Sequence, residues 1–198
     1  MNRLVFIEGV SGVGKTTTTS FLHNKLQDMG ILLDCHLEGD CENPLDPFGG
    51  TYPPEMPLSL FGKTYADCWR NFMKNQIQQE TKLIVDGTLL HHQINDLLRY
   101  YNASNEAIVN HFSNLIQIIQ SLNPIVIYLF SKDVGKRLGH ANESRGKLVP
   151  TKEEITFWEN RKQIDLFVLE KLSVKSHIID IDYGWDLAIE TVIKCVTK

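Results

Sequence analysis

Short apolar runs alternate along the chain with longer stretches in which apolar residues recur every three or four positions. The short runs predict strands buried on both faces, and the recurring spacing predicts amphipathic helices. The predicted strands cover residues 3–8, 31–38, 82–86, 124–130 and 176–181, and the predicted helices cover 15–29, 58–80, 90–101, 108–119, 151–172 and 185–196. Five buried strands separated by helices predict an α/β fold, a parallel sheet with helices on both faces.

Two connections between these elements differ from ordinary turns. Residues 39–57 hold five of the seven prolines, and long connections of this kind in a compact domain are usually functional or disordered. Residues 132–150 combine three glycines with five cations, which is typical of a lid that closes over phosphates and excludes water. A solvated basic loop is the alternative for this segment. The five cations are Lys132, Lys136, Arg137, Arg145 and Lys147.

A phosphate-binding motif lies between the first predicted strand and the first predicted helix. Residues 9–16 read GVSGVGKT and match GxxxxGK[ST], in which glycines let backbone N–H groups surround a phosphate at a helix N-terminus. Lys15 is expected to reach the β- and γ-phosphates of ATP, and the Thr16 hydroxyl to bind Mg²⁺. The residues predicted to bind the nucleotide are Gly9, Val10, Ser11, Gly12, Val13, Gly14, Lys15, Thr16 and Thr17.

Composition narrows the class of protein. The 198 residues suggest one domain, 1–198, and the net charge of −4 without a basic tail argues against nucleic-acid binding. No apolar run approaches the length of a membrane span, and Glu8 interrupts the apolar N-terminal run, so no signal peptide is expected. The four cysteines lack CxxC spacing, which favours a cytoplasmic protein without zinc or disulfides.

The stretch FIEGVSGVGKTT resembles the first strand and phosphate loop of thymidylate kinases and the related deoxynucleoside kinases, whose usual form is close to FIEGxDGxGKTT. The resemblance implies a three-layer P-loop fold with strand order 2-3-1-4-5. It also implies a substrate loop after the second strand, at about 39–57, and a lid after the fourth, at about 132–150.

The chain departs from those kinases at several positions. Ser11 stands where they carry an acid, Gly87 follows Asp86 where thymidylate kinases have arginine, and Glu38 is followed by glycine rather than proline. The Glu-Arg-Ser motif of deoxynucleoside kinases is missing too. We therefore expect a divergent member of the group and do not assign thymidylate as its substrate.

Carboxylates and cations supply the candidates for catalysis. Asp86 ends an apolar strand, where it would bind Mg²⁺ or instead cap the next helix. Glu38 or Asp40 could accept the proton of the acceptor hydroxyl, as the equivalent glutamate does in the kinases that the chain resembles, and Asp40 is also a candidate substrate contact. The alternative is that both carboxylates only anchor the loop. Arg137 and Arg145 are the candidate charge stabilisers, because a guanidinium binds phosphate oxygens bidentately.

The acceptor side is less sharply defined. Arg70 and His92, with the adjacent His91 and Gln93, are candidates to contact the substrate, although a histidine pair in the first turn of a helix is more often merely exposed. An aromatic stripe on the second predicted helix could stack on a base but is more often part of the core. Glu8 is expected to bind backbone amides or to take part in catalysis.

These residues favour an ATP- and Mg²⁺-dependent kinase of a small hydroxylated or nucleotide-like molecule. Its partners would be a nucleoside triphosphate and that acceptor, and a homodimer stays open. The alternative is a regulatory nucleotide-binding NTPase without a small-molecule acceptor. A GTPase should carry NKxD after the fourth strand, and this chain has FSKD there.

Overall fold

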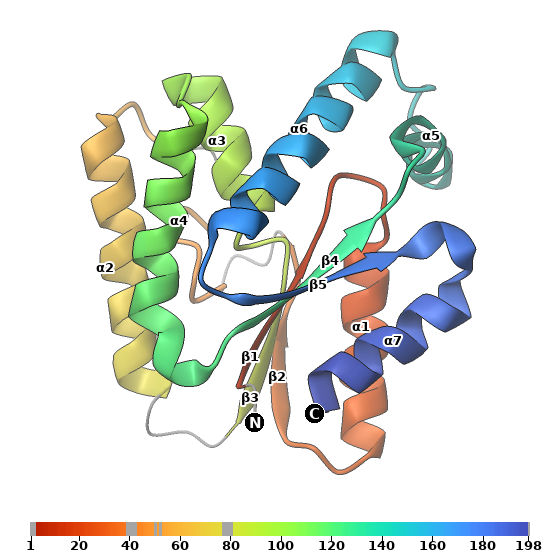
Figure 1. Ribbon diagram of the computed structural model, residues 1–198, viewed down its shortest axis with the longest axis horizontal. Helices are drawn as coiled ribbons and strands as arrows, with labels where there is room; N and C mark the ends of the chain where they lie inside the picture. Colours follow the sequence, from red (N-terminus) through yellow and green to blue (C-terminus); the bar gives the residue numbers. More distant parts are fainter. Residues whose placement is uncertain (1–2, 39–42, 50, 52, 77–80, 198) are drawn as a thin grey trace.

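The sheet has five parallel strands in the order β2-β3-β1-β4-β5, as the resemblance implied (Figure 1). The computed structural model describes residues 3–38, 43–49, 51, 53–76 and 81–197. Asp40, a candidate substrate contact, lies outside these residues. The strands are β1 (Leu4–Glu8), β2 (Leu33–His36), β3 (Lys82–Asp86), β4 (Ile125–Phe130) and β5 (Lys175–Asp180).

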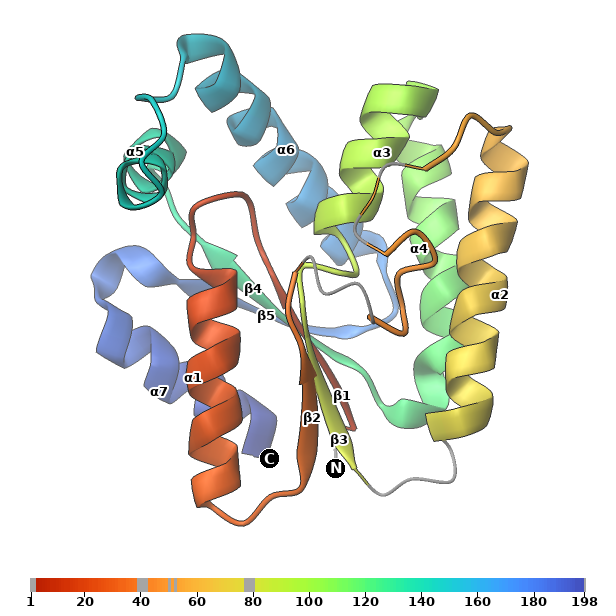
Figure 2. The same ribbon diagram turned by 180° about the vertical axis from the view of Figure 1, so that it is seen from behind.

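Helices cover both faces of the sheet, which makes the three layers of the predicted fold (Figures 1 and 2). Alternating residues of β1 divide the core, because Leu4 and Phe6 join one apolar cluster while Val5 and Ile7 join the other. The first cluster includes side chains of α2 (Leu58–Gln76), α3 (His91–Tyr101), α4 (Asn105–Ile119) and α6 (Lys152–Lys171). The second includes side chains of α1 (Lys15–Asp28) and α7 (Trp185–Thr197).

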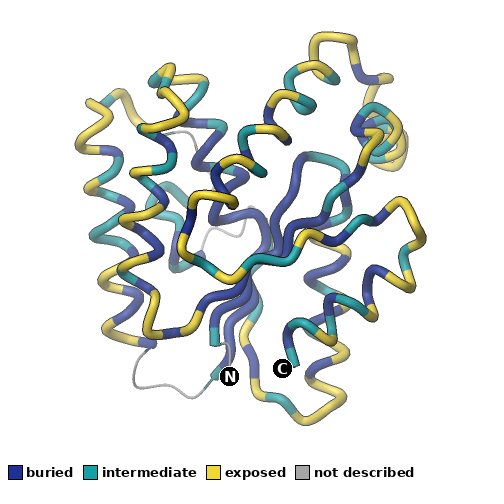
Figure 3. Tube along the Cα trace, viewed as in Figure 1, coloured by how far each residue is buried: buried dark blue, intermediate teal, exposed yellow. Residues whose placement is uncertain are grey.

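Burial follows the same layers. The central strands are buried along their length, whereas the outward faces of the helices are exposed (Figure 3). In the described part of the chain, no helix combines the length and the apolar character needed to cross a lipid bilayer.

The segment 132–150 contains a helix that the sequence analysis did not predict, α5 (Val134–Ser144). The Asp133 side chain caps it by accepting the backbone N–H of Lys136 at 2.8 Å. Val134 and Leu138, four residues apart on one face of this helix, are its buried residues. Two apolar residues among glycines and charges give too weak a pattern to predict a helix. The segment expected to form a lid therefore consists of a helix followed by irregular chain at 146–150.

The proline-rich connection has no helix or strand among its described residues, yet it is anchored at several points. Leu45 is fully buried, and its carbonyl accepts the indole N–H of Trp69 at 2.9 Å. The Asn43 amide donates to the Thr88 hydroxyl at 2.6 Å. These contacts fix the connection against α2 and the turn between β3 and α3.

A buried polar cluster joins α6 to α3 and to the sheet. Arg161 is fully buried and donates to the carbonyl oxygens of Leu90 at 2.8 Å and His91 at 3.1 Å. Its Nε donates to Asp165 at 2.9 Å, and Asp165 also accepts the Tyr128 hydroxyl at 3.0 Å. Arg161 therefore ties α6 to the first turn of α3, where the Leu90 carbonyl also accepts the backbone N–H of Ile94.

We predict that Arg161→Met lowers the free energy of unfolding by about 3–5 kcal/mol, because it leaves Asp165 as a buried charge without its cation. Urea unfolding of the full chain measures the change. The double variant Arg161→Met/Asp165→Leu should recover part of the loss, and the exposed Lys152→Ala should stay within about 0.5 kcal/mol of the parent. A loss below about 1 kcal/mol for Arg161→Met would show that the buried polar cluster does not stabilise the packing of α6 against α3 and the sheet.

Candidate phosphate-loop site

The phosphate loop leaves β1 and opens directly into α1. Gly9, Gly12 and Gly14 have φ angles of 144°, 85° and 88°, which side chains rarely tolerate. A Cβ at Gly12 would lie 2.8 Å from the carbonyl oxygen of Arg137. Glycine at this position therefore allows the backbone of α5 to rest on the loop.

A cavity of about 540 Å³, hereafter the loop cavity, lies over the phosphate loop. Lys15, Thr16 and Thr17 line it from α1, together with Ser11, Gly12 and Gly14 of the loop. Its other walls are Glu38, His92, His140, Ala141, Ser144 and Arg145. Val10 and Val13, which were predicted to bind the nucleotide, have their side chains in the core, so only their backbone groups are left for a ligand.

Thr16 and Asp86 meet at the floor of this site. The Thr16 hydroxyl donates to Asp86 Oδ2 at 2.6 Å, and the Glu38 backbone N–H lies 3.4 Å from the same oxygen. Asp86 Oδ1 is buried and has no hydrogen-bond partner among the described residues. Burial raises the pKa of Asp86, an effect that Lys15 and Thr16 oppose. A hydroxyl beside an unsatisfied carboxylate oxygen is a donor set that suits a hard cation such as Mg²⁺.

Glu38 lies between a lysine and two histidines. Its Oε2 is 3.4 Å from the Lys15 ammonium, and its Oε1 is 3.5 Å from Nε2 of His91 and 3.7 Å from Nε2 of His92. Gly87, with φ of 63°, makes this arrangement possible, because a Cβ there would lie 3.2 Å from both Glu38 Oε2 and Lys15 Cε. The glycine that departs from the thymidylate kinase pattern is thus explained by the space that Lys15 and Glu38 need.

His91 is buried rather than exposed, which corrects the general expectation for a histidine pair in a first helical turn. Its ring stacks on Trp158 with centroids 5.2 Å apart, and Nδ1 lies 3.2 Å from the Gly9 carbonyl oxygen. Burial and the nearby charge of Lys15 hold the pKa of His91 well below its usual value. The ring is therefore uncharged at neutral pH. His92 is only half-buried, and its Nε2 has no hydrogen-bond partner among the described residues.

A second cavity, of about 430 Å³, adjoins the loop cavity and shares Glu38 and His92 with it. Both charged and aromatic side chains line this second cavity. They are Asp46, Thr51, Tyr65, His91, Asn95, Asp96, Arg99, Lys147 and Trp158, together with the two shared residues.

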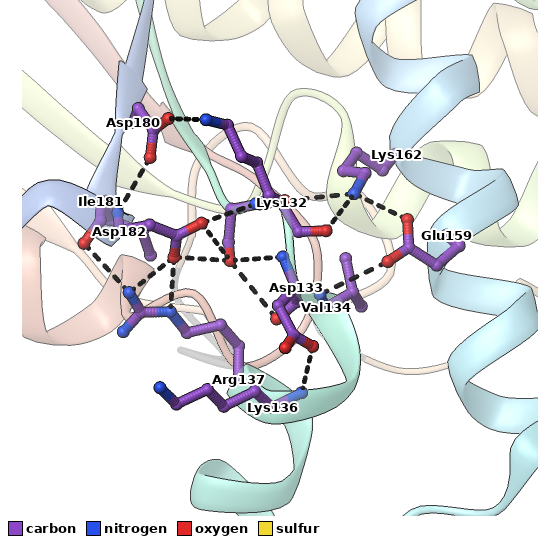
Figure 4. A network of polar contacts seen from close by, with 11 residues as sticks. Lys132, Asp133, Val134, Lys136, Arg137, Glu159, Lys162, Asp180, Ile181 and Asp182 are labelled. Atoms are coloured by element: carbon purple, nitrogen blue, oxygen red, sulfur yellow. Dashed lines mark hydrogen bonds and ion pairs between the residues drawn. The ribbon is translucent and has the colours of Figure 1, made fainter.

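Three predicted arginines have different surroundings. Arg145 is exposed and lines the loop cavity. Arg137 instead donates to Asp182 Oδ1 at 2.8 Å and to the Ile181 carbonyl at 3.0 Å, within a network that ties α5 to the end of β5 (Figure 4). Arg70 pairs with Asp67 at 2.9 Å and lines a groove between α2 and α4. Arg70 therefore lines neither the loop cavity nor the second cavity.

Two polar residues of the second cavity were not singled out from the sequence. Asn95 and Asp96 follow His92 at helical spacing and Arg99 continues the same face, so α3 carries a polar stripe. That spacing was the available signal. Trp158 and His140 reach the site from α6 and α5, and no local pattern marks either of them.

Comparisons with known proteins identify the fold. No protein-family model and no curated protein sequence matches the chain. Among solved structures, the YorR protein of Bacillus subtilis, crystallised in complex with phosphorylated GDP, superposes with a TM-score of 0.62 at 14% sequence identity. The match covers 98% of this chain and 95% of that chain. The chain therefore has an α/β fold of the P-loop NTPase type.

Glu8 binds backbone groups of the turn that carries His91. Its two carboxylate oxygens accept the backbone N–H groups of Leu89 at 2.7 Å and His91 at 3.1 Å. Complete burial raises the pKa of Glu8 to about 8, although Lys15 and the N–H groups act in the opposite direction. These contacts fit the expectation that Glu8 binds backbone amides.

We predict that Glu8 makes the free energy of unfolding fall as pH rises from about 5 to 8. The unfolded chain loses this proton near 4.5 and the folded chain near 8, so only the folded state holds it between these values. The slope is up to about 1.4 kcal/mol per pH unit. Urea unfolding from pH 5 to 9 should show a shallower slope for Glu8→Gln and an unchanged slope for the exposed Glu170→Gln. Parallel curves for Glu8→Gln and the parent would contradict the assignment.

Proposed function

We propose that the protein is an ATP- and Mg²⁺-dependent phosphotransferase that moves the γ-phosphate to a small hydroxylated acceptor. The observation that carries the proposal is the pair of cavities that meet at Glu38 and His92. A protein that only holds a nucleotide needs the loop cavity alone. The second cavity offers a place for an acceptor beside the same carboxylate.

Nucleotide binding is supported by the loop itself. Its backbone N–H groups and the N-terminus of α1 form a site for phosphate, and Lys15 is available for the β- and γ-phosphates. The structurally similar YorR protein was crystallised with phosphorylated GDP, and the first strand resembles that of thymidylate and deoxynucleoside kinases. Both likenesses favour a nucleoside triphosphate as the phosphate donor.

Thr16 and Asp86 would hold Mg²⁺, since the Thr16 hydroxyl lines the loop cavity and the unbonded Oδ1 of Asp86 belongs to the carboxylate beside it. The ion would neutralise charge on the β- and γ-phosphates when bound.

In the proposed reaction, Lys15 turns from Glu38 to the phosphates and frees the carboxylate. The acceptor hydroxyl oxygen forms a bond to the γ-phosphorus, and the bond from that phosphorus to its bridging oxygen breaks. The electron pair of the broken bond leaves with ADP, and the hydroxyl proton passes to Glu38. Arg145, at the edge of the loop cavity, would bind the phosphoryl oxygens in transit.

Arg137 has a different part in the proposal from the one expected of a lid arginine. Its guanidinium is already bound to Asp182, and its carbonyl lies over Gly12. We assign it to positioning α5 against the loop, so that Arg145 faces the nucleotide. The whole chain, 1–198, would act as one kinase domain.

Lys15→Ala should lower acceptor-dependent ADP formation by about 10²- to 10³-fold, because it removes the cation that stabilises charge on the transferring group. The exposed Lys25→Ala on the same helix is the matched control and should retain activity. Circular dichroism checks that both variants are folded. Near-normal turnover in folded Lys15→Ala would refute the assignment of the phosphate loop.

Glu38→Gln should lower kcat by about 10²-fold or more while changing ATP affinity much less, since an amide cannot accept the hydroxyl proton. Steady-state kinetics give kcat, and calorimetry gives the affinity for a non-hydrolysable ATP analogue. Glu170→Gln serves as the control for a surface amide. A variant that loses only thermal stability would make Glu38 a structural residue.

ADP release with Mg·ATP, measured across nucleosides, nucleoside monophosphates, sugars and amino sugars, tests the function itself. We expect turnover to rise at least tenfold with one acceptor class. Turnover that no hydroxylated molecule changes but that a protein partner stimulates would overturn the proposal in favour of a regulatory NTPase.

A further inference from the structure

The wall of the second cavity away from the phosphate loop is acidic. Asp46, Tyr65 and Asp96 line it from the proline-rich connection, α2 and α3. Burial, together with the charges of Asp46 and Asp96, holds the pKa of Tyr65 well above its usual range. Two acidic groups therefore face the same small space.

Asp96 stands out because it is buried without a partner. Its exposed fraction is 8%, and its side-chain carboxylate, which lines the cavity, makes no hydrogen bond or ion pair with any described residue. Burial and the charge of Asp46 raise its pKa to about 7, and Arg99 lowers it only in part. A buried carboxylate without a donor destabilises the folded state. Such residues are typical of binding sites, where a ligand supplies the missing donor.

The cations of the second cavity offset the charge of Asp96 only in part, and none of those among the described residues forms an ion pair with it. Arg99 is exposed, and its guanidinium lies 5.1 Å from the centroid of the Phe157 ring. Lys147 is exposed too, and His91 is uncharged at neutral pH. An anionic group beside Asp46 and Asp96 would be repelled by these carboxylates in a partly desolvated site, whereas a cation would be attracted to both and would favour the charged form of Asp96.

We propose that the second cavity takes an unphosphorylated acceptor that carries a cationic nitrogen group, which Asp96 and Asp46 bind while the acceptor hydroxyl faces Glu38. This inference rests on the proposed function for the role of the hydroxyl, but the charge preference is a property of the cavity alone. The ligand class comprises hydroxylated amines and cationic nucleosides. Acceptors with a phosphate at that wall are excluded.

Two matched ligand sets test the preference by calorimetry on the full chain. One set is glucose, 2-amino-2-deoxyglucose and glucose 6-phosphate, and the other is guanosine and 7-methylguanosine, whose base is positively charged. Mg·ADP binding is measured first, and each set is titrated with and without Mg·ADP. We expect the cationic member of at least one set to bind at least tenfold more tightly than its neutral analogue, and glucose 6-phosphate to bind more weakly than glucose.

Asp96→Asn separates a binding role from a structural one. It should abolish the tenfold preference, leave Mg·ADP affinity unchanged and raise thermal stability at pH 8, because an unpartnered buried charge is removed. Asp46→Asn should also weaken the preference for cationic ligands. If Asp96→Asn does not fold, Asp46→Asn takes its place in the test. The exposed Asp34→Asn on β2 is the control and should retain the preference.

The inference is overturned if neutral or anionic ligands bind as tightly as the cationic ones in both sets, or if both asparagine variants keep the preference. Mg·ADP binding without a charge preference would contradict this inference and leave the phosphotransferase proposal standing. A charge preference without any binding of Mg·ADP would support the acidic wall and contradict the proposed function.

Discussion

The contact between Lys15 and Glu38 joins the phosphate loop to the residues that follow β2. Lys15 is buried and Glu38 is about a third exposed, and their charged atoms are 3.4 Å apart. Parallel strands bring the two together, because β1 and β2 flank β3 and end at the same edge of the sheet. The contact requires Gly87 at the end of β3, where a side chain would intrude. The boundary between the two cavities is built on this contact.

The second cavity depends on a different interaction. Arg161 of α6 binds the carbonyl groups of Leu90 and His91 and thereby fixes the start of α3. From below, Glu8 accepts two N–H groups of the same turn. Together Arg161 and Glu8 hold His91 against Trp158, at one side of the cavity. These buried ionisable side chains are thus arranged around the turn that carries the histidine pair.

Much of this architecture could be predicted from the sequence. The five strands and the helix over 151–172 follow from local patterns, and the structure confirms both. A capping box of Thr151 and Glu154 begins this helix. The strand order came from the resemblance, and the structure confirms it too. The helix α5 was missed because two apolar residues among glycines and charges give little signal.

The candidate site residues also divide into those that local sequence patterns specify and those that only the fold brings together. Lys15, Thr16 and Asp86 lie together because a motif and a strand end specify them. Asp96 and Trp158 come from helices distant in the chain, and only tertiary structure brings them to one cavity. Arg70 is the one arginine between Arg3 and Arg99, but its position in the sequence does not reveal which face of the helix carries it. The role of Arg70 and the roles of the other site residues stay predictions.

The fate of the γ-phosphate tests the central claim most directly. Phosphorus NMR would follow Mg·ATP together with an acceptor that binds the second cavity. The account predicts that the γ-phosphate signal is replaced by a phosphomonoester signal coupled to protons of the acceptor, with one ADP formed for each ester. Release of inorganic phosphate alone, at the same rate with and without the acceptor, would contradict it.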